Sequence, residues 1–319
     1  MTSPSFSLLI VGTGALATLF AARLRAAGVE MTLLGSWPEG VEALRRHGAR
    51  LWVEGEAEAR AFSVRVATRP EEVGQVRFAL VLVKAWQTAR AARHLQACLA
   101  AEGVALTLQN GLGNVETLAG ALGRERVAVG VTTTGATLVA PGVVRPGGEG
   151  VIHLGEHPRL EPVVRWLQRA GFSVEVSPDV QGLIWGKLAV NAAINPLTTL
   201  LEVPNGALVA NAAARLFLRR AAWEVQAVAG ALGVRLPFPD AADAAEEVAR
   251  RTARNLSSML QDLRRGAPTE IDAISGAVVR FGRQVGVSTP VNQALWEMVK
   301  EKVERRRQAA PSAHKKNGA

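Results

Sequence analysis

The chain of 319 residues has little of several residue types that often carry structure or chemistry. Its one cysteine, Cys98, excludes an intramolecular disulfide and a cysteine-rich zinc site. No apolar run approaches the ~20 residues that a membrane span requires. The first seven residues carry no Lys or Arg, which argues against a secretory signal. We therefore expect a cytoplasmic protein that does not interact with a membrane.

Histidine is also scarce, with five residues in the chain. Only His153 and His157 lie close together, and Pro158 follows them, so we interpret both as polar loop residues. Paired histidines on a helix, the usual ligands of a zinc ion, are missing. We expect no bound metal.

The net charge of +9 comes largely from one end of the chain. The last 20 residues hold seven Lys or Arg and two Glu, whereas charges of both signs are scattered through the rest. A scattered, nearly balanced charge does not favour nucleic-acid binding, and we expect none. Residues 307–319 are predicted to form a basic disordered tail.

Lysine is rare outside that tail. Of 37 basic residues, 31 are Arg, and only Lys84 and Lys187 precede residue 300. A compositional bias of the genome would explain the excess of Arg. Even so, Arg stays charged, whereas Lys is a compact donor whose pKa can be lowered, so the two lysines are candidates for sites where Arg would fail.

Strand and helix patterns alternate in the first half of the chain. Strands are predicted over 6–11, 30–34, 78–83, 104–108, 127–133, 150–154 and 172–176, and helices over 15–27, 88–100, 114–122 and 161–170. Strands separated by helices at this spacing form a parallel sheet with right-handed crossovers. Residues 132–145, which contain Pro141-Gly142, are predicted to add an antiparallel hairpin to the sheet edge.

Only helices are predicted in the second half. They cover 179–195, 208–232, 241–263, 271–285 and 292–306, with breaks at Asn195-Pro196, Pro204-Asn205-Gly206, Pro237-Phe238-Pro239 and Gly266-Ala267-Pro268. The loss of the strand pattern after Ser177-Pro178 suggests a domain boundary at about residue 178. We expect a domain of residues 1–178 and a helical domain of residues 179–306.

A glycine-rich turn joins the first predicted strand to the first predicted helix. It has the form GxGxxA and consists of Gly12, Thr13, Gly14, Ala15, Leu16 and Ala17. Its first glycine permits a tight turn, its second allows a close approach of a pyrophosphate, and its last small residue allows the helix to pack on the strand. Because strand, turn and helix agree, we predict an α/β, Rossmann-type dinucleotide-binding domain followed by an all-α domain.

The end of the second strand bears on which nicotinamide cofactor binds. An Asp or Glu there would bind the ribose 2′-OH of NAD, but this chain has Gly35 and Ser36. Ser36 could donate a hydrogen bond to a 2′-phosphate. Lys84, directly after the strand 78–83, is our candidate for its positive partner. A solvated lysine at a strand end is the alternative, and the scarcity of lysine in the chain favours the phosphate contact. The pattern favours NADP(H).

Three polar side chains share one face of an apolar helix in the second half. Lys187, Asn191 and Asn195 are spaced by four residues, which places them in line. They could line a ligand site, where a desolvated Lys187 with a lowered pKa could donate a proton to a ketone. A capped helix packed on a loop, ending at Asn195 before Pro196, would also explain the pattern.

Three further segments of the chain are rich in polar side chains. Residues 255–262 place hydroxyls within a predicted helix, and Pro268-Thr269-Glu270 has the form of a helix start with Thr269 as N-cap. Glu270 in that first turn would be stabilised by the helix dipole alone. Asn110-Gly111-Leu112-Gly113 follows the strand 104–108 at the carboxyl edge of the sheet.

These segments resemble the ketopantoate reductases, also called 2-dehydropantoate 2-reductases. The matching segments are GTGALA from Gly12, LVKAWQ from Leu82, QNGLG from Gln109, KLAVNAAINPLT from Lys187, PNG from Pro204 and NLSSMLQDLRRGAPTEID from Asn255. The resemblance spans residues 8 to about 303. It implies NADPH-dependent reduction of 2-dehydropantoate to (R)-pantoate on the way to pantothenate and coenzyme A.

The resemblance also implies a role for each matching residue. Lys187 would be the general acid, and Glu270 would hold the substrate hydroxyl. Asn110, Asn191, Asn195, Asn205 and Ser258 would line the substrate site. The glycine-rich turn, Ser36, Lys84, Gln87 and Asn110 would contact the cofactor. The chain departs from the family pattern at Ala17, where a third glycine is usual, and at Ser36, where an arginine often binds the 2′-phosphate.

Two other functions remain open from the sequence. One is a related NAD(P)H-dependent reductase of another 2-oxo acid, and the other is an NADPH-binding sensor without turnover. The sensor is disfavoured because both Lys187 and Glu270 are present. The helices of the second half could also supply the face of a homodimer.

Overall fold

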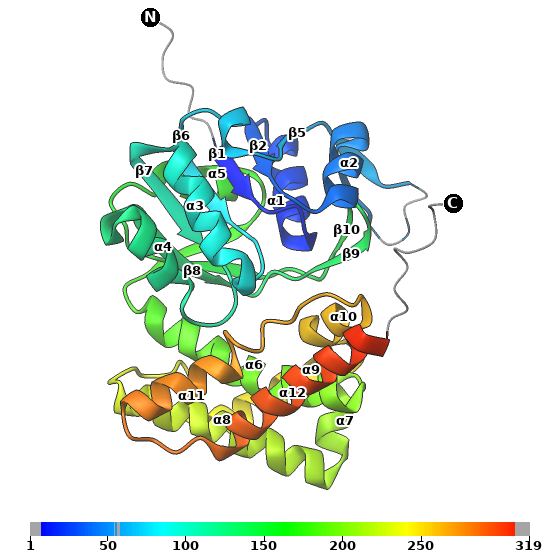
Figure 1. Ribbon diagram of the computed structural model, residues 1–319, viewed down its shortest axis with the longest axis vertical. Helices are drawn as coiled ribbons and strands as arrows, with labels where there is room; N and C mark the ends of the chain where they lie inside the picture. The colour runs from blue at the N-terminus through cyan, green and yellow to red at the C-terminus, as the bar shows by residue number, and fades with distance from the viewer. Residues whose placement is uncertain (1–7, 54, 56–57, 310–319) are drawn as a thin grey trace, which may run out of the picture. The chain divides into compact units, whose positions relative to one another are not determined.

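The computed structural model describes residues 8–53, 55 and 58–309, and these form two compact units. The sheet unit comprises residues 8–109 and 113–180 (Figure 1). The helical unit comprises residues 181–309 and also Asn110–Leu112. A segment from the first half of the chain is therefore part of the helical unit, which the order of elements along the chain did not predict.

An eight-stranded sheet runs through the sheet unit in the order β12-β11-β8-β7-β6-β1-β2-β5. Its strands are β1 (Leu8–Val11), β2 (Met31–Leu34), β5 (Arg65–Ala67), β6 (Val76–Val81), β7 (Leu99–Thr107), β8 (Val127–Thr132), β11 (Val151–Gly155) and β12 (Ser173–Ser177). Neighbours from β5 to β8 are parallel, whereas β11 is antiparallel to β8. The chain order reverses between β1 and β6, and ligands of such sheets bind at the carboxyl ends of the strands at this switch point.

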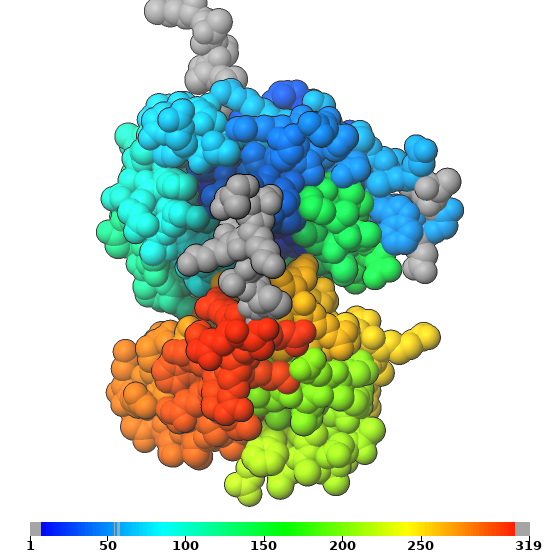
Figure 2. Space-filling model, turned by 45° about the vertical axis from the view of Figure 1, so that its right-hand side comes forward, coloured from blue at the N-terminus to red at the C-terminus, as the bar shows by residue number. Residues whose placement is uncertain are grey.

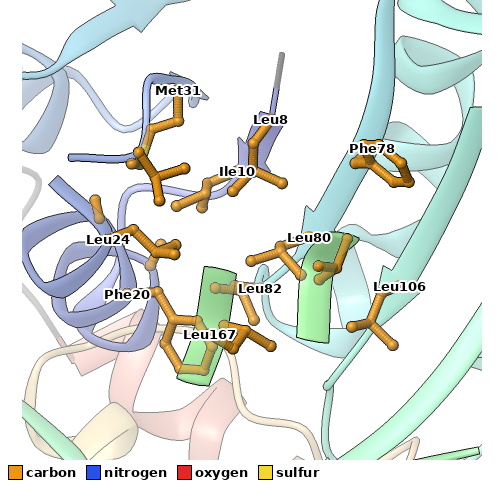
Figure 3. Packing of buried hydrophobic residues seen from close by; sticks show 14 of the residues in the cluster. Leu8, Ile10, Phe20, Leu24, Met31, Phe78, Leu80, Leu82, Leu106 and Leu167 are labelled. Carbon is orange, nitrogen blue, oxygen red and sulfur yellow. The ribbon is translucent and has the colours of Figure 1, made fainter. Parts of the chain in front are cut away.

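Helices cover both faces of this sheet, which confirms the predicted α/β class (Figure 1). The helices of the unit are α1 (Ala15–Ala26), α2 (Pro38–His47), α3 (Thr88–Cys98), α4 (Asn114–Leu122) and α5 (Glu161–Arg169). Side chains of α1, α2 and α5 share one buried cluster, and those of α3 and α4 share the other. Figure 3 shows the first cluster, including Ile10, Phe20, Leu24, Leu80, Leu106 and Leu167.

A second, four-stranded sheet accounts for the burial of helix α1 on more than one side. Its order is β4-β3-β10-β9, from β3 (Ala49–Leu51), β4 (Arg60–Phe62), β9 (Ala136–Ala140) and β10 (Val143–Pro146). It packs against α1 from the side away from the main sheet. Helix α1 is therefore buried on two sides, and this explains why residues 17–22 are all buried.

The second sheet corrects one prediction. Strands β9 and β10 do form an antiparallel hairpin, but β10 pairs with β3 and the hairpin is absent from the edge of the main sheet. The short strands β3, β4 and β5 and helix α2 were also not predicted. Strands of three residues carry too little alternation to be recognised. Residues 6 and 7 of the first predicted strand lie outside the described residues.

The helical unit consists of seven helices among the described residues. They are α6 (Val180–Leu201), α7 (Asn205–Ala210), α8 (Ala212–Ala231), α9 (Ala241–Arg251), α10 (Ser258–Arg264), α11 (Ser275–Gln284) and α12 (Pro290–Ala309). Helix α12 packs on α8 and α11, and Figure 2 shows its red atoms on the surface of this unit beside the orange atoms of α11. Over the described ranges, no helix combines the length and apolar character that crossing a bilayer requires.

Several predicted helix limits in this unit are wrong. Helix α6 continues through Pro196 to Leu201, and the hydroxyls of Thr198 and Thr199 bond to the carbonyls of Ile194 and Asn195 in the turn around the proline. Residues 208–232 and 241–263 each form two helices, because Asn211 and Ser257 cap new helices. Helix α12 includes residues 307–309 of the predicted tail, whereas residues 310–319 lie outside the described residues.

A buried carboxylate joins helices α8 and α9. Glu246 is 2% exposed, and its Oε1 lies 2.7 Å from Arg215 Nε and 2.9 Å from Arg219 Nη1. Arg250 contacts the second carboxylate oxygen. The hydrogen bond from Arg215, together with those from the other two guanidinium groups, lowers the pKa of Glu246 to about 2.

We predict that Glu246→Gln lowers the free energy of unfolding by about 2 kcal/mol at pH 7. Because the pKa of Glu246 is lower in the folded than in the unfolded chain, its stabilisation is complete above pH ~5 and is lost as the pH falls towards 2. Urea denaturation at several pH values measures both effects. Glu247→Gln is the matched control, since Glu247 is exposed and 4.0 Å from Arg250. Equal stability of the two variants at pH 7 would contradict the prediction.

Candidate active site

The glycine-rich turn is built for a close approach of an anion. Gly12 has φ of 133°, a conformation that favours glycine, and an added Cβ would lie 3.1 Å from the carbonyl oxygen of Leu82. Gly14 is exposed at the N-terminus of α1, and an added Cβ there would meet nothing within 4 Å. The first turn of α1 has no acidic residue and no capping side chain. No side chain therefore occupies its first N–H groups, and the binding of a pyrophosphate there stays a prediction.

A third glycine brings the second strand against this turn. A Cβ on Gly35 would lie 2.3 Å from Cγ2 of Thr13, so only glycine fits between the end of β2 and the turn. Ser36, exposed directly after it, lies at the carboxyl edge of the sheet. The sequence alone marked Gly35 only as part of the strand end. A glycine immediately after a predicted strand was the available signal.

The segment after β6 carries the other two candidate cofactor residues. Strand β6 lies next to β1, and Leu82 N donates to the carbonyl of Val11. Lys84 precedes a short 3₁₀ helix, Ala85–Gln87, and both Lys84 and Gln87 are half-buried. The two side chains therefore belong to the same edge of the sheet as the glycine-rich turn.

In the helical unit, α6 carries the predicted polar face. Lys187, Asn191 and Asn195 lie in line along the helix, while Leu188, Ala189 and Ala192 are buried in the core. Lys187 is half-buried and Asn195 is 6% exposed. Because α6 continues beyond Pro196, Asn195 does not end the helix, and the interpretation of this asparagine as a terminal residue is wrong.

Lys187 and Glu270 share one environment, although 83 positions separate them in the sequence. Burial lowers the pKa of Lys187 to about 8, while the carboxylate of Glu270 acts in the opposite direction and raises it. Glu270 is 5% exposed, and its Oε2 lies 3.3 Å from Nδ2 of Asn110. An amine that can lose its proton near neutral pH therefore lies with a carboxylate and an amide.

The backbone around Asn110 explains how it reaches Glu270. Leu112 N donates to the carbonyl of Ala273 over 2.9 Å. Gly111 has φ of 78°, and an added Cβ would lie 2.4 Å from the same carbonyl oxygen, so glycine is required there. These contacts hold residues 110–112 against the segment that follows Glu270.

The helix start predicted at Thr269 is wrong. Residues 271–274 form a turn, in which Ala273 N and Ile274 N donate to the carbonyl of Glu270, and α11 begins at Ser275. The turn allows both Ile271 and Ile274 to enter the core. Glu270 therefore does not lie in the first turn of a helix, and the helix dipole does not explain its burial.

The remaining two predicted residues lie near the other end of α6. Ser258 is exposed in the first turn of α10, whose N-cap Ser257 lies 2.7 Å from the hydroxyl of Thr198. Asn205 N donates to the carbonyl of Asn255, and Asn205 Nδ2 donates to Thr252. Within the described residues, the buried Oδ1 of Asn205 has no hydrogen-bond partner and could accept a bond from a ligand.

No group of three or more His, Cys, Asp or Glu side chains in the described ranges could hold a metal ion. Lys187 and Glu270 are the ionisable candidates that share one environment, and the amides of Asn110, Asn191 and Asn195 can add neutral hydrogen bonds.

Comparisons with known proteins agree with the resemblance noted in the sequence. A 2-dehydropantoate 2-reductase from Halobacterium salinarum is 37% identical over 299 residues, 92% of this chain and 97% of that protein. A PanE/ApbA family ketopantoate reductase from Ralstonia eutropha has a TM-score of 0.87 at 32% identity, covering 94% of this chain and 99% of that one. D-mandelate dehydrogenase, solved with NADH and anilino(oxo)acetate, also has a TM-score of 0.87, at 26% identity and the same coverage.

Family models match both halves of the chain. Residues 8–159 match ketopantoate reductase PanE/ApbA, and residues 179–303 match the ketopantoate reductase PanE/ApbA C terminal. Together with the full-length relatives, these matches establish that the chain belongs to the ketopantoate reductase (PanE/ApbA) family.

Proposed function

We propose that this chain is an NADPH-dependent 2-dehydropantoate 2-reductase, which forms (R)-pantoate for the synthesis of pantothenate and coenzyme A. The observation that carries the proposal is the buried Glu270 carboxylate, 3.3 Å from Asn110 Nδ2, in the environment of Lys187, whose pKa is lowered by burial. A ketone reduction needs a proton donor that is protonated at working pH and gives up its proton readily. The family and its curated relatives supply the substrate class.

The proposed chemistry assigns one task to each charged group. NADPH, when bound, supplies the hydride that adds to the ketone carbon. Lys187 donates its proton to the ketone oxygen, so that the product is a neutral alcohol and the lysine is left as an amine. Desolvation favours that outcome, because it destabilises the ammonium ion relative to the amine.

Glu270 and the amide side chains would orient the substrate. The Glu270 carboxylate accepts a hydrogen bond from the distal hydroxyl of 2-dehydropantoate. Asn191, Asn195 and Ser258 can donate to the substrate carboxylate without bringing a fixed charge into the site, and Asn205 can accept a hydrogen bond from the substrate through its Oδ1. Asn110, which contacts Glu270, would border both the substrate and the cofactor.

The proposed preference for NADPH over NADH rests on residues at the carboxyl edge of the main sheet. The glycine-rich turn with the open position at Gly14 fits a dinucleotide, and no carboxylate lies between the end of β2 and Glu39 to repel a 2′-phosphate. Lys84 and Gln87 would contact that phosphate, with Ser36 in place of the usual arginine. We also propose a cytoplasmic enzyme and a homodimer through the helical domain, where α8 exposes Leu216 and Phe217.

A reductase of another 2-oxo acid is the second candidate, because D-mandelate dehydrogenase has the same fold and was solved with NADH. Rates of NADPH and NADH oxidation with 2-dehydropantoate and with 2-oxoisovalerate distinguish the two. The proposed function requires a strong preference for 2-dehydropantoate. Equal rates with both acids would favour the second candidate, and no turnover with either would favour a sensor.

The pKa of Lys187 leads to a prediction for the pH dependence of the reaction. Since the protonated amine is the active form and its pKa is about 8, the rate of the reductive step should fall as the pH rises through 8. Single-turnover oxidation of NADPH from pH 6 to 10 measures this step. We expect Lys187→Ala to lose ~10²–10⁴-fold in rate together with the alkaline decline. Lys187→Arg should be slow but should also lack the decline, and an unchanged decline in either variant would refute the assignment.

The proposed role of Glu270 predicts two effects of the substitution Glu270→Gln. Glu270→Gln should remove most of the discrimination against 2-oxoisovalerate, which we expect to be ~10⁴-fold in the parent chain, because a neutral amide loses less than a buried carboxylate when the substrate lacks the hydroxyl that would bond to it. It should also move the alkaline decline to lower pH, since Glu270 raises the pKa of Lys187. Measurement of kcat/KM for both acids as a function of pH tests both effects. Asp272→Asn is the control, as Asp272 is an exposed carboxylate two residues away; an effect as large there would contradict the role of Glu270.

A further inference from the structure

Gln109, at the end of β7, connects two segments at the carboxyl edge of the main sheet. Its Nε2 donates to the carbonyl of Val83 over 2.9 Å and to Oγ1 of Thr88 over 2.8 Å. Its Oε1 lies 2.9 Å from Oγ1 of Thr107, which can donate to it. The carboxamide thus uses two donors and one acceptor at once, a combination that only Asn and Gln side chains offer.

Thr88 extends this network around the same segment. It is 2% exposed, and its Oγ1 lies 2.8 Å from the carbonyl oxygen of Ala85 and 2.8 Å from Oδ1 of Asn114. The hydroxyl accepts from Gln109 and can donate to one of these two oxygens at a time. The carbonyls on either side of Lys84 thus each have a partner in this network: Gln109, after β7, holds that of Val83, and Thr88, at the start of α3, can hold that of Ala85.

We propose that Gln109 is a positioning residue that fixes the backbone on both sides of Lys84, and so sets the preference for NADPH over NADH. The inference rests on the proposed role of Lys84 at the 2′-phosphate. A flexible lysine has to be ordered before it can hold a phosphate, and fixing its backbone lowers that cost. Gln109 itself does not need to contact the cofactor.

A purely structural role would have a different signature. If Gln109 only stabilised the sheet edge, its loss would weaken the binding of NADPH and NADH alike, because both use the glycine-rich turn. If it positions Lys84, its loss should weaken NADPH binding far more, since only NADPH carries the 2′-phosphate. The ratio of the two dissociation constants therefore separates the two roles.

The test measures NADPH and NADH dissociation constants of the full chain by fluorescence titration. Gln109→Glu keeps the size of the side chain but places a carboxylate oxygen against the Val83 carbonyl. We expect it to reduce NADPH affinity by ~10-fold or more and NADH affinity by no more than ~2-fold. Thr88→Val, which removes only the hydroxyl, should shift the ratio in the same direction and provides the test should Gln109→Glu not fold.

Two further variants separate the possible outcomes. Gln96→Glu is the matched control, because Gln96 Nε2 also donates to a backbone carbonyl, that of Ala121, over 2.9 Å. Its ratio of NADPH to NADH dissociation constants should not change.

Lys84→Ala should lose the NADPH preference, and adding Gln109→Glu to it should cause little further loss. If Lys84→Ala loses the preference while Gln109→Glu and Thr88→Val weaken both cofactors equally, Gln109 is only structural. If Lys84→Ala keeps the preference, the assignment of Lys84 fails and the inference fails with it, while reductase activity can still stand.

Discussion

The proposed chemistry of the helical unit depends on two opposing effects on the pKa of one ammonium group, that of Lys187. Removing Lys187 from water favours its neutral form, and the nearby Glu270 carboxylate favours its charged form. Desolvation is the larger effect, since the pKa falls to about 8. Without Glu270, the amine would be neutral at a lower pH and would carry a proton to donate over a narrower pH range. Without burial, it would hold its proton too tightly to donate it.

Local backbone geometry makes this balance possible. The turn at 271–274 places Glu270 below the surface, and Gly111 allows residues 110–112 to lie against Ala273. Asn110 is thereby added to the helical unit, although it follows a strand of the sheet unit along the chain. Gly12 and Gly35 play a comparable part in the sheet unit, where they let strand ends and the glycine-rich turn approach more closely than a side chain would permit.

Sequence patterns predicted those features that follow from local chemistry. The glycine-rich turn, the α/β order of the first half and the spacing of Lys187, Asn191 and Asn195 all depend on residues close in the chain. The second sheet was missed, because its pairing of β3 with β10 joins segments about 90 residues apart. The continuation of α6 through Pro196 was also missed, since its support comes from threonine hydroxyls and packing in the core. The burial of Glu270 depends on Asn110 and on the turn at 271–274, and no local pattern in the sequence shows either.

The scarcity of lysine makes the central claim directly measurable. With lysine labelled selectively at its side-chain carbon and nitrogen, the chain gives six ε-amine signals, and Lys187→Arg identifies the one of interest. Titration of the full chain by nuclear magnetic resonance should show that signal changing near pH 8, more than two units below the ~10.4 of an ordinary lysine. A Lys187 signal that titrates above pH 10 would contradict the account, because the amine would then be neither desolvated nor suited to donate a proton.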